Sequence, residues 1–123
     1  MITSKFNEEI NILETEFTGE VDSVSILLYL NEFKTNTTLP RTLKTLVKAE
    51  KVKFKFSVKD LKDFNAVKNQ SLKQYNNVAS AVVISNPIGA ALCTMYGALA
   101  NNESYKYKVF STQEAALLWL NSM

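Results

Sequence analysis

The segment that most constrains the fold is residues 78–84, a run of seven residues that carries no charge. Its sequence is Val-Ala-Ser-Ala-Val-Val-Ile, and turn-forming residues stand on both sides of it. A run of this length and composition is typical of a strand that is covered on both faces. Such a strand needs helices on both sides of its sheet, so the sequence predicts a layered α/β domain.

The C-terminal residues predict one further strand and one further helix. Residues 105–110 alternate as a strand does, and Ser111-Thr-Gln-Glu114 has the pattern of a capping box. Residues 115–120 then form a short apolar helix, in which we expect Trp119 to dock on the core.

Earlier segments follow the same alternation. Residues 10–18 predict a strand with a hairpin partner near residues 5–8, and two more strand-like runs cover 43–49 and 51–56. A helix is expected after a cap at Asp22 or Ser23, and another after Ser57. We expect the first helix to bury a stripe of five residues and the second to bury six: Val24, Leu27, Leu28, Leu30 and Phe33; then Val58, Leu61, Phe64, Val67, Leu72 and Tyr75.

A further helix is expected from Pro87, because proline is favoured at the first helical position. Its core side is predicted to carry Ile88, Leu92, Met95 and Leu99. Together these signals predict a mixed sheet of four or five strands with about four helices.

Length and composition are those of one globular domain over residues 1–123, with 46% hydrophobic and 21% charged residues. No apolar run approaches the roughly 18 residues that a membrane span needs, and the N-terminus lacks the pattern of a signal peptide. Cys93 is the single cysteine, which fits a reducing compartment. We therefore expect a cytoplasmic protein.

Charge is unevenly distributed along the chain. Residues 1–35 carry seven acidic residues and two lysines, whereas residues 36–70 carry nine basic and three acidic residues. The two charged segments either attract each other within the fold or form a bipolar surface that orients partners. The net charge is only +2, and Arg41 is the single arginine, so no nucleic-acid partner is expected.

Several of these segments resemble the small bacterial STAS-like (SpoIIAA-like) domains. The likeness lies in Phe110 followed by Ala116, Trp119 and Leu120, in residues 78–85 followed by Asn86-Pro87-Ile-Gly-Ala, and in residues 17–21. The resemblance implies a SpoIIAA-like fold. It also implies a mostly non-catalytic protein that acts by presenting surfaces to partners.

In the anti-sigma-factor antagonists of that family, a phosphorylatable serine follows an aspartate. The corresponding stretch here, residues 54–60, contains no Asp-Ser pair, which places a kinase-driven switch in doubt. Ser57 is a candidate phosphorylation site by location alone. Its alternative role, which we favour, is to cap the following helix.

The residues for common catalytic sites are missing. The chain has no histidine, which removes Ser-His and Cys-His nucleophile activation. Its three glycines form no phosphate loop, and its lone cysteine cannot make a thiolate metal cluster. Two carboxylate pairs are expected to be solvated: Glu14 with Glu16 and Asp60 with Asp63. We therefore expect no catalytic residues, no metal, no cofactor and no enzyme activity.

Two sets of residues are candidate interaction surfaces. Lys51, Lys53 and Lys55 could bind an anionic partner or a lipid headgroup, although lysines on a strand edge also deter aggregation. Gly89, Cys93 and Gly97 recur every four residues and form a smooth helical stripe. That stripe could serve a homodimer, or it could let the helix approach its sheet closely, which we favour.

The function expected from the sequence is a non-enzymatic, regulatory protein-interaction module with an unidentified protein partner. The alternative is a small carrier of a lipid or other apolar ligand, because STAS-like domains resemble the Sec14-type lipid-binding fold. In that case the apolar helices near 26–33 and 88–99 would line a pocket, and the basic segment 41–68 would approach an anionic membrane surface.

Overall fold

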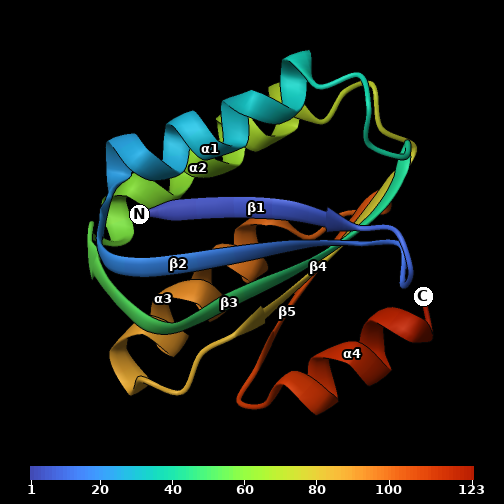
Figure 1. Ribbon diagram of the computed structural model, residues 1–123. Coiled ribbons are helices and arrows are strands. Elements are labelled where there is room, and N and C mark those ends of the chain that lie inside the picture. The colour runs from blue at the N-terminus through green and yellow to red at the C-terminus, as the bar shows by residue number, and fades with distance from the viewer.

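The computed structural model describes residues 1–123 and contains five strands, four α-helices and one short 3-10 helix (Figure 1). In chain order the elements are β1 (Ile2–Asn7), β2 (Ile12–Asp22), α1 (Ser23–Thr35), β3 (Thr42–Lys55), η1 (Val58–Asp60), α2 (Leu61–Ser71), β4 (Asn77–Val83), α3 (Pro87–Ala100), β5 (Tyr105–Phe110) and α4 (Gln113–Asn121).

All five strands belong to one sheet, whose spatial order is β1-β2-β3-β4-β5. β1 is antiparallel to β2, and every other neighbouring pair is parallel. The parallel pairs are joined by crossovers that contain the helices, as parallel strands require. The predicted mixed α/β sheet is therefore confirmed.

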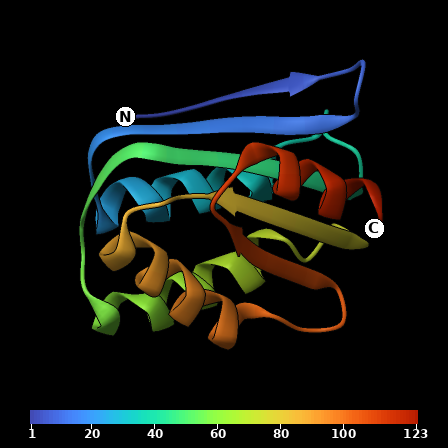
Figure 2. The ribbon, with the colours of Figure 1, turned by 90° about the horizontal axis from the view of Figure 1, so that it is seen from below.

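The helices cover both faces of the sheet. The larger core lies between the sheet and α1, α2 and α3, while a smaller core of seven buried residues lies under α4 on the other face (Figure 2). β4 contributes to both cores, and residues 78–84 are all buried. The sequence prediction of a strand covered on both faces is confirmed.

β3 joins the two strand-like runs that the sequence predicted separately. Its pairing with β2 changes register between Glu16 and Thr18, where β3 carries one extra residue. This bulge keeps the apolar residues of both halves on one face, so Val47 and Phe54 line the same cavity. Beyond the bulge β3 pairs with β2 alone, because β4 pairs only with residues 42–48.

Helix α1 begins at the predicted cap but buries a different stripe. Asp22 Oδ1 accepts a hydrogen bond from the backbone N–H of Ser25 at 2.9 Å. The buried residues are Ile26, Leu30 and Phe33, whereas Val24 and Leu28 are 60% and 62% exposed. The prediction for Val24 and Leu28 was wrong because α1 is apolar on more than one face, so periodicity alone does not choose the face that meets the sheet.

Helix α4 docks on the smaller core, as predicted. Trp119 is half-buried and packs on Phe110, with 5.7 Å between ring centroids. The fully buried anchors of this helix are Ala116 and Leu120, both 0% exposed. Leu120 therefore contributes more to the docking of α4 than the sequence indicated.

Candidate functional site

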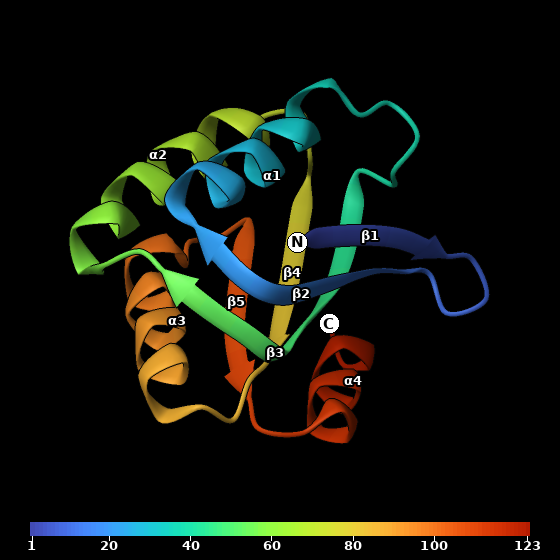
Figure 3. The ribbon, with the colours of Figure 1, turned by 60° about the vertical axis from the view of Figure 1, so that its left-hand side comes forward.

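Helix α3 begins where the sequence predicts, and its start is capped locally. Asn86 Oδ1 accepts a hydrogen bond from the backbone N–H of Gly89 at 2.9 Å, and Pro87 occupies the first turn. The helix then runs for 14 residues without a single charged side chain. It lies on one side of β5, with α4 on the other side (Figure 3).

The inner face of α3 consists mainly of small residues. A Cβ atom placed on Gly97 would lie 2.9 Å from Tyr107 Cδ1, and one on Gly89 would lie 2.6 Å from Ile84 Cδ1. Both distances are shorter than real Cβ contacts, so glycine is what allows α3 to approach the sheet. Gly89, Cys93 and Gly97 are buried there and are not available for the dimer contact that the sequence left open.

Three of the four large aliphatic residues of α3 lie on its outer face. Ile88 is 76% exposed, Leu99 50% and Met95 43%, and Leu92 is half-buried. The prediction that Ile88, Met95 and Leu99 mark the core side was therefore wrong, whereas Leu92 lies at the edge of the core and helps to line an internal cavity. The reason is steric, because the space beneath α3 is filled by Tyr107 and by Tyr96, whose rings pack edge to face with 4.8 Å between centroids.

The remaining exposed residues of α3 are small or uncharged. They are Pro87, Ala91, Thr94 and Ala98. Exposed apolar side chains that stand singly on a surface need no explanation, but a contiguous apolar patch marks a site of interaction. The outer face of α3 is therefore a candidate docking surface.

Cys93 lies on the inner face of α3 and is 7% exposed. Burial raises the pKa of its thiol to about 11, so the thiol stays protonated at neutral pH. A protonated, buried thiol is a poor nucleophile. Cys93 acts as a small core residue.

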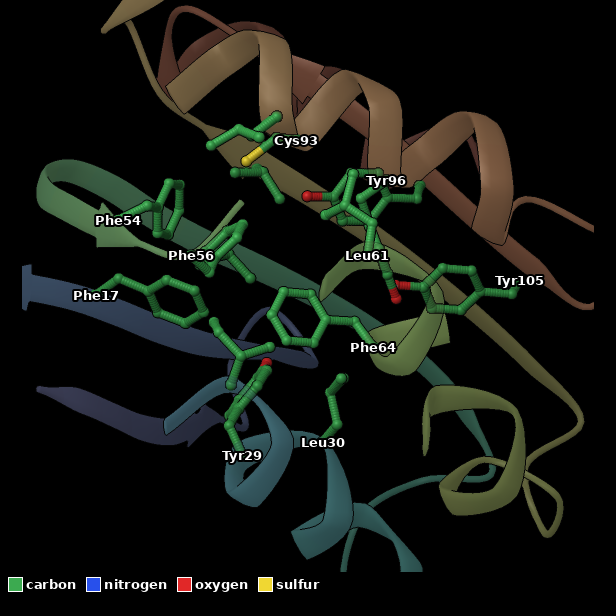
Figure 4. A pocket seen from close by; sticks show the side chains of 15 residues that line it. Phe17, Tyr29, Leu30, Phe54, Phe56, Leu61, Phe64, Cys93, Tyr96 and Tyr105 are labelled. Atoms are coloured by element: carbon green, nitrogen blue, oxygen red, sulfur yellow. The ribbon is translucent and has the colours of Figure 1, made fainter. Parts of the chain in front are cut away.

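A cavity of about 80 Å³ lies between the sheet and helices α1, α2 and α3, and all 15 residues that line it are hydrophobic. Figure 4 shows Cys93 and Tyr96 pointing into it from α3, and Leu30 and Tyr29 reaching it from α1. Phe54 and Phe56, both half-buried, pack against each other at one end with 4.8 Å between ring centroids. Pockets for drug-sized ligands measure roughly 300–1,000 Å³, so this cavity holds at most a very small apolar molecule.

Buried tyrosines contribute hydroxyl groups to this core layer near α3. The hydroxyl oxygens of Tyr96 and Tyr105 lie 3.3 Å apart within hydrogen-bonding distance. Burial raises the pKa of Tyr29 to about 12 and raises that of Tyr105 well above its usual value. These phenols are neutral at physiological pH and offer no base for proton transfer.

Lys68 is a buried residue that the sequence analysis missed. It is 1% exposed, and its Nζ donates hydrogen bonds to Ala100 O at 2.9 Å and to Asn69 Oδ1 at 2.8 Å. Burial lowers its pKa to about 8. Its amine is engaged in joining α2 to the end of α3, where a cation also interacts favourably with the helix dipole.

Helical spacing could have indicated this position. Leu61, Phe64 and Lys68 follow one another at intervals of three and four, and all three are buried. The apolar periodicity predicts Val67 and Val58 on this face instead. Val67 is only partly buried and Val58 is 50% exposed, so the prediction for Val58 was wrong.

Part of the predicted charge asymmetry is paired within the sheet. The acidic strand β2 pairs with the lysine-rich strand β3, so that Glu20 lies opposite Lys53 and Asp22 opposite Lys55. Lys55 Nζ lies 3.6 Å from Glu20 Oε2, and Lys48 Nζ lies 3.5 Å from Glu14 Oε1. The first of our two alternatives, attraction within the fold, accounts for these residues.

The lysine row is exposed, but it is not a free cationic patch. Lys51, Lys53 and Lys55 stand on the part of β3 that lacks a second neighbouring strand. Acidic residues of β2 lie beside two of them, which weakens attraction for an external anion. Their position on an open edge matches the protective role that the sequence analysis favoured.

Ser57 stands at the start of η1, where its backbone N–H donates to Asp60 Oδ2 at 2.9 Å. Its side chain is exposed. The capping position of Ser57 is confirmed, and its phosphorylation stays a prediction. Asp60 and Glu14, from the two carboxylate pairs, are engaged by Ser57 and Lys48 respectively.

Comparison with solved structures identifies a similar architecture. An uncharacterised protein of the DUF3478 family with a SpoIIAA-like fold, from Shewanella loihica PV-4, matches with a TM-score of 0.61. The match covers 98% of this chain and 92% of that protein at 13% sequence identity. The chain has a SpoIIAA-like fold. At this identity the likeness carries the fold alone, and it confirms the architecture that the sequence resemblance implied.

Comparison by sequence adds no relative, because no family model and no curated protein matches the chain. None of the helices of the SpoIIAA-like fold has the length and apolar character that crossing a membrane requires.

Proposed function

We propose that the chain is a non-enzymatic, cytoplasmic interaction module that presents the outer face of α3 to a protein partner. The observation that carries the proposal is the exposure of Ile88, Met95 and Leu99 on a helix without charged residues. Burying such a face against a partner removes apolar surface from water and leaves no charge unpaired.

The chemistry of the buried polar groups supports a non-enzymatic role. The chain has no histidine, and the thiol of Cys93 and the phenols of Tyr29 and Tyr105 have raised pKa values because they are buried. The amine of Lys68 already donates to two oxygen atoms within the fold. No group near the cavity is poised as a base or nucleophile at neutral pH.

The test is affinity capture from the native organism, after mild crosslinking, with three versions of the protein as bait. Ile88→Lys places a charge on the outer face of α3, and Leu118→Lys is the matched control, since Leu118 is 73% exposed on α4. Proteins that bind through α3 should be retained by the wild type and by Leu118→Lys and lost with Ile88→Lys. Identical captures by all three baits, or no enriched protein, would contradict the proposal.

The cavity favours a second candidate function, a carrier of a small apolar ligand of Sec14-like character. Its entirely hydrophobic lining supports this function, and its volume of about 80 Å³ opposes it. A lipid chain would need more space than this cavity provides. Native mass spectrometry of freshly purified protein tests the candidate, because a carrier retains an apolar ligand whereas the interaction module has the mass of the bare chain.

A further inference from the structure

The four large apolar residues of α3 have a spacing that reads the same in both directions. Ile88, Leu92, Met95 and Leu99 are separated by four, three and four residues. This alternation is the seam of a coiled coil, in which apolar residues recur every 3.5 residues on average. We refer to these four residues as the α3 seam.

A palindromic seam fits a second copy of itself in the antiparallel direction. If two α3 helices pack across a two-fold axis, Ile88 of one copy faces Leu99 of the other, and Leu92 faces Met95. A two-fold interface of this kind brings the same patch together from both copies. Each of the four residues therefore meets an apolar partner of similar size, Leu92 through the part of its side chain that does not line the internal cavity.

Charge also favours a second copy. A symmetric contact places identical surfaces against each other, so any net charge on the surface would repel itself. Helix α3 has no charged side chain, and exposed Ala91 and Ala98 beside the seam allow the helices to approach closely. The neighbouring edge strand β5 is different, because self-pairing there would bring together Lys106 and Lys108, both exposed.

We infer that the partner of the α3 face is a second copy of this chain, bound through an antiparallel pair of α3 seams. The inference rests on the proposed function, of which it specifies the partner. A helix of 14 residues is about 21 Å long and about 10 Å wide, a footprint of roughly 200 Å². Stable interfaces bury roughly 800 Å² per partner. The expected dimer is therefore weak and reversible, with a dissociation constant between about 10 and about 100 μM.

The test is sedimentation velocity of the full chain at concentrations from about 5 to about 500 μM, a range chosen to bracket that expected constant. The wild type should pass from monomer to dimer. Ile88→Lys and Leu99→Glu each place a charge opposite an apolar residue of the other copy, and each should weaken association at least about tenfold. Leu28→Lys, at a 62% exposed position on α1, is the control and should leave association unchanged.

The decisive sample is the double variant Ile88→Lys/Leu99→Glu. Positions 88 and 99 lie about 16 Å apart along one helix, so the two charges cannot pair within a copy. In the antiparallel dimer each lysine meets a glutamate of the other copy, and association should return to within about threefold of the wild type. Failure of the double variant to recover would overturn the antiparallel arrangement.

A wild type that stays monomeric over the whole range would overturn the inference as a whole. The proposed function would stand after that outcome if the wild-type bait retained a different protein in affinity capture and the Ile88→Lys bait did not. Circular dichroism of each variant verifies folding. All three substituted side chains are at least half exposed, so the fold should be retained.

Discussion

Helices α3 and α4 lie on opposite sides of β5 (Figure 3), and both are largely apolar, yet each places a residue of different size directly against the sheet. Helix α4 places Leu120 against the sheet and meets Ala79 and Ala81 of β4 there. Helix α3 places Gly97 against the sheet and meets Tyr107 of β5. Small residues on a strand leave room for large residues on a helix, and large residues on a strand require small ones.

The comparison teaches that volume, as well as hydrophobicity, decides which face of a helix is buried. Protein interiors are filled at the density of organic crystals, so a given space accepts one large side chain and not two. The space beneath α3 is filled by Tyr96 of α3 and Tyr107 of β5. The side chains of Ile88, Met95 and Leu99 are consequently left outside, where they can meet a partner.

Truncating one leucine on each helix should give the largest contrast. Leu120 is 0% exposed, and Leu120→Ala should lower the free energy of unfolding by about 3 kcal/mol, through lost burial and the cavity left behind. Leu99 is 50% exposed, and Leu99→Ala should cost less than about 0.5 kcal/mol in the monomer. Urea unfolding of dilute protein measures both, and equal costs would show that α3 buries its leucine.

Enlarging one residue on each face of α3 should give a smaller contrast, because added bulk should destabilise the protein on the inner face and not on the outer face. Gly97→Leu forces atoms into the ring of Tyr107 and should lower the free energy of unfolding by about 2 kcal/mol. Ala98→Leu adds the same kind of bulk at the next, exposed position and should change it by less than about 0.5 kcal/mol. A Gly97→Leu protein as stable as Ala98→Leu would mean that α3 does not lie this close to the sheet.

Lys68 extends the comparison to the end of α3, and its effect should appear as a pH dependence. Its pKa falls from 10.5 to about 8 on folding, so between these values the unfolded chain binds more protons than the folded one. The free energy of unfolding should therefore rise with pH across this window. Urea unfolding of the wild type and Lys68→Met, at a pH just below 8 and again below 10, measures the effect.

The wild type should gain stability relative to Lys68→Met as the pH rises through this interval. The interval stays below pH 10 because the buried tyrosines, whose pKa values are raised, act in the other direction above it. Both proteins contain Cys93, so the contribution of its thiol to the pH dependence cancels when their free energies of unfolding are compared. A constant difference between the two proteins would show that Lys68 titrates normally.

Much of the fold could be predicted from the sequence because its signals are local. The uncharged run at residues 78–84 indicated a strand covered on both faces, and Asp22 and Pro87 indicated the starts of helices, since a helix start depends on a few neighbouring residues. The division of β3 into two runs was wrong because its bulge is a property of the pairing with β2.

The candidate site could not be predicted in the same way. Both faces of α3 are uncharged, and periodicity alone gave the larger residues to the core. The choice depends on Tyr107, which lies in another element and fills the space beneath the helix. Lys68 was missed for a related reason, because its buried oxygen partner Ala100 comes from α3.

The most direct test of the orientation of α3 uses the single native cysteine. In an Ile88→Cys variant that retains Cys93, one thiol should be exposed on the outer face and the other buried on the inner face. N-ethylmaleimide treatment of the dilute native protein, followed by peptide mass spectrometry, should label position 88 rapidly and leave Cys93 unmodified until the protein is unfolded. Rapid labelling of Cys93 with protection of the introduced thiol would contradict the account, because α3 would then turn its large residues to the core.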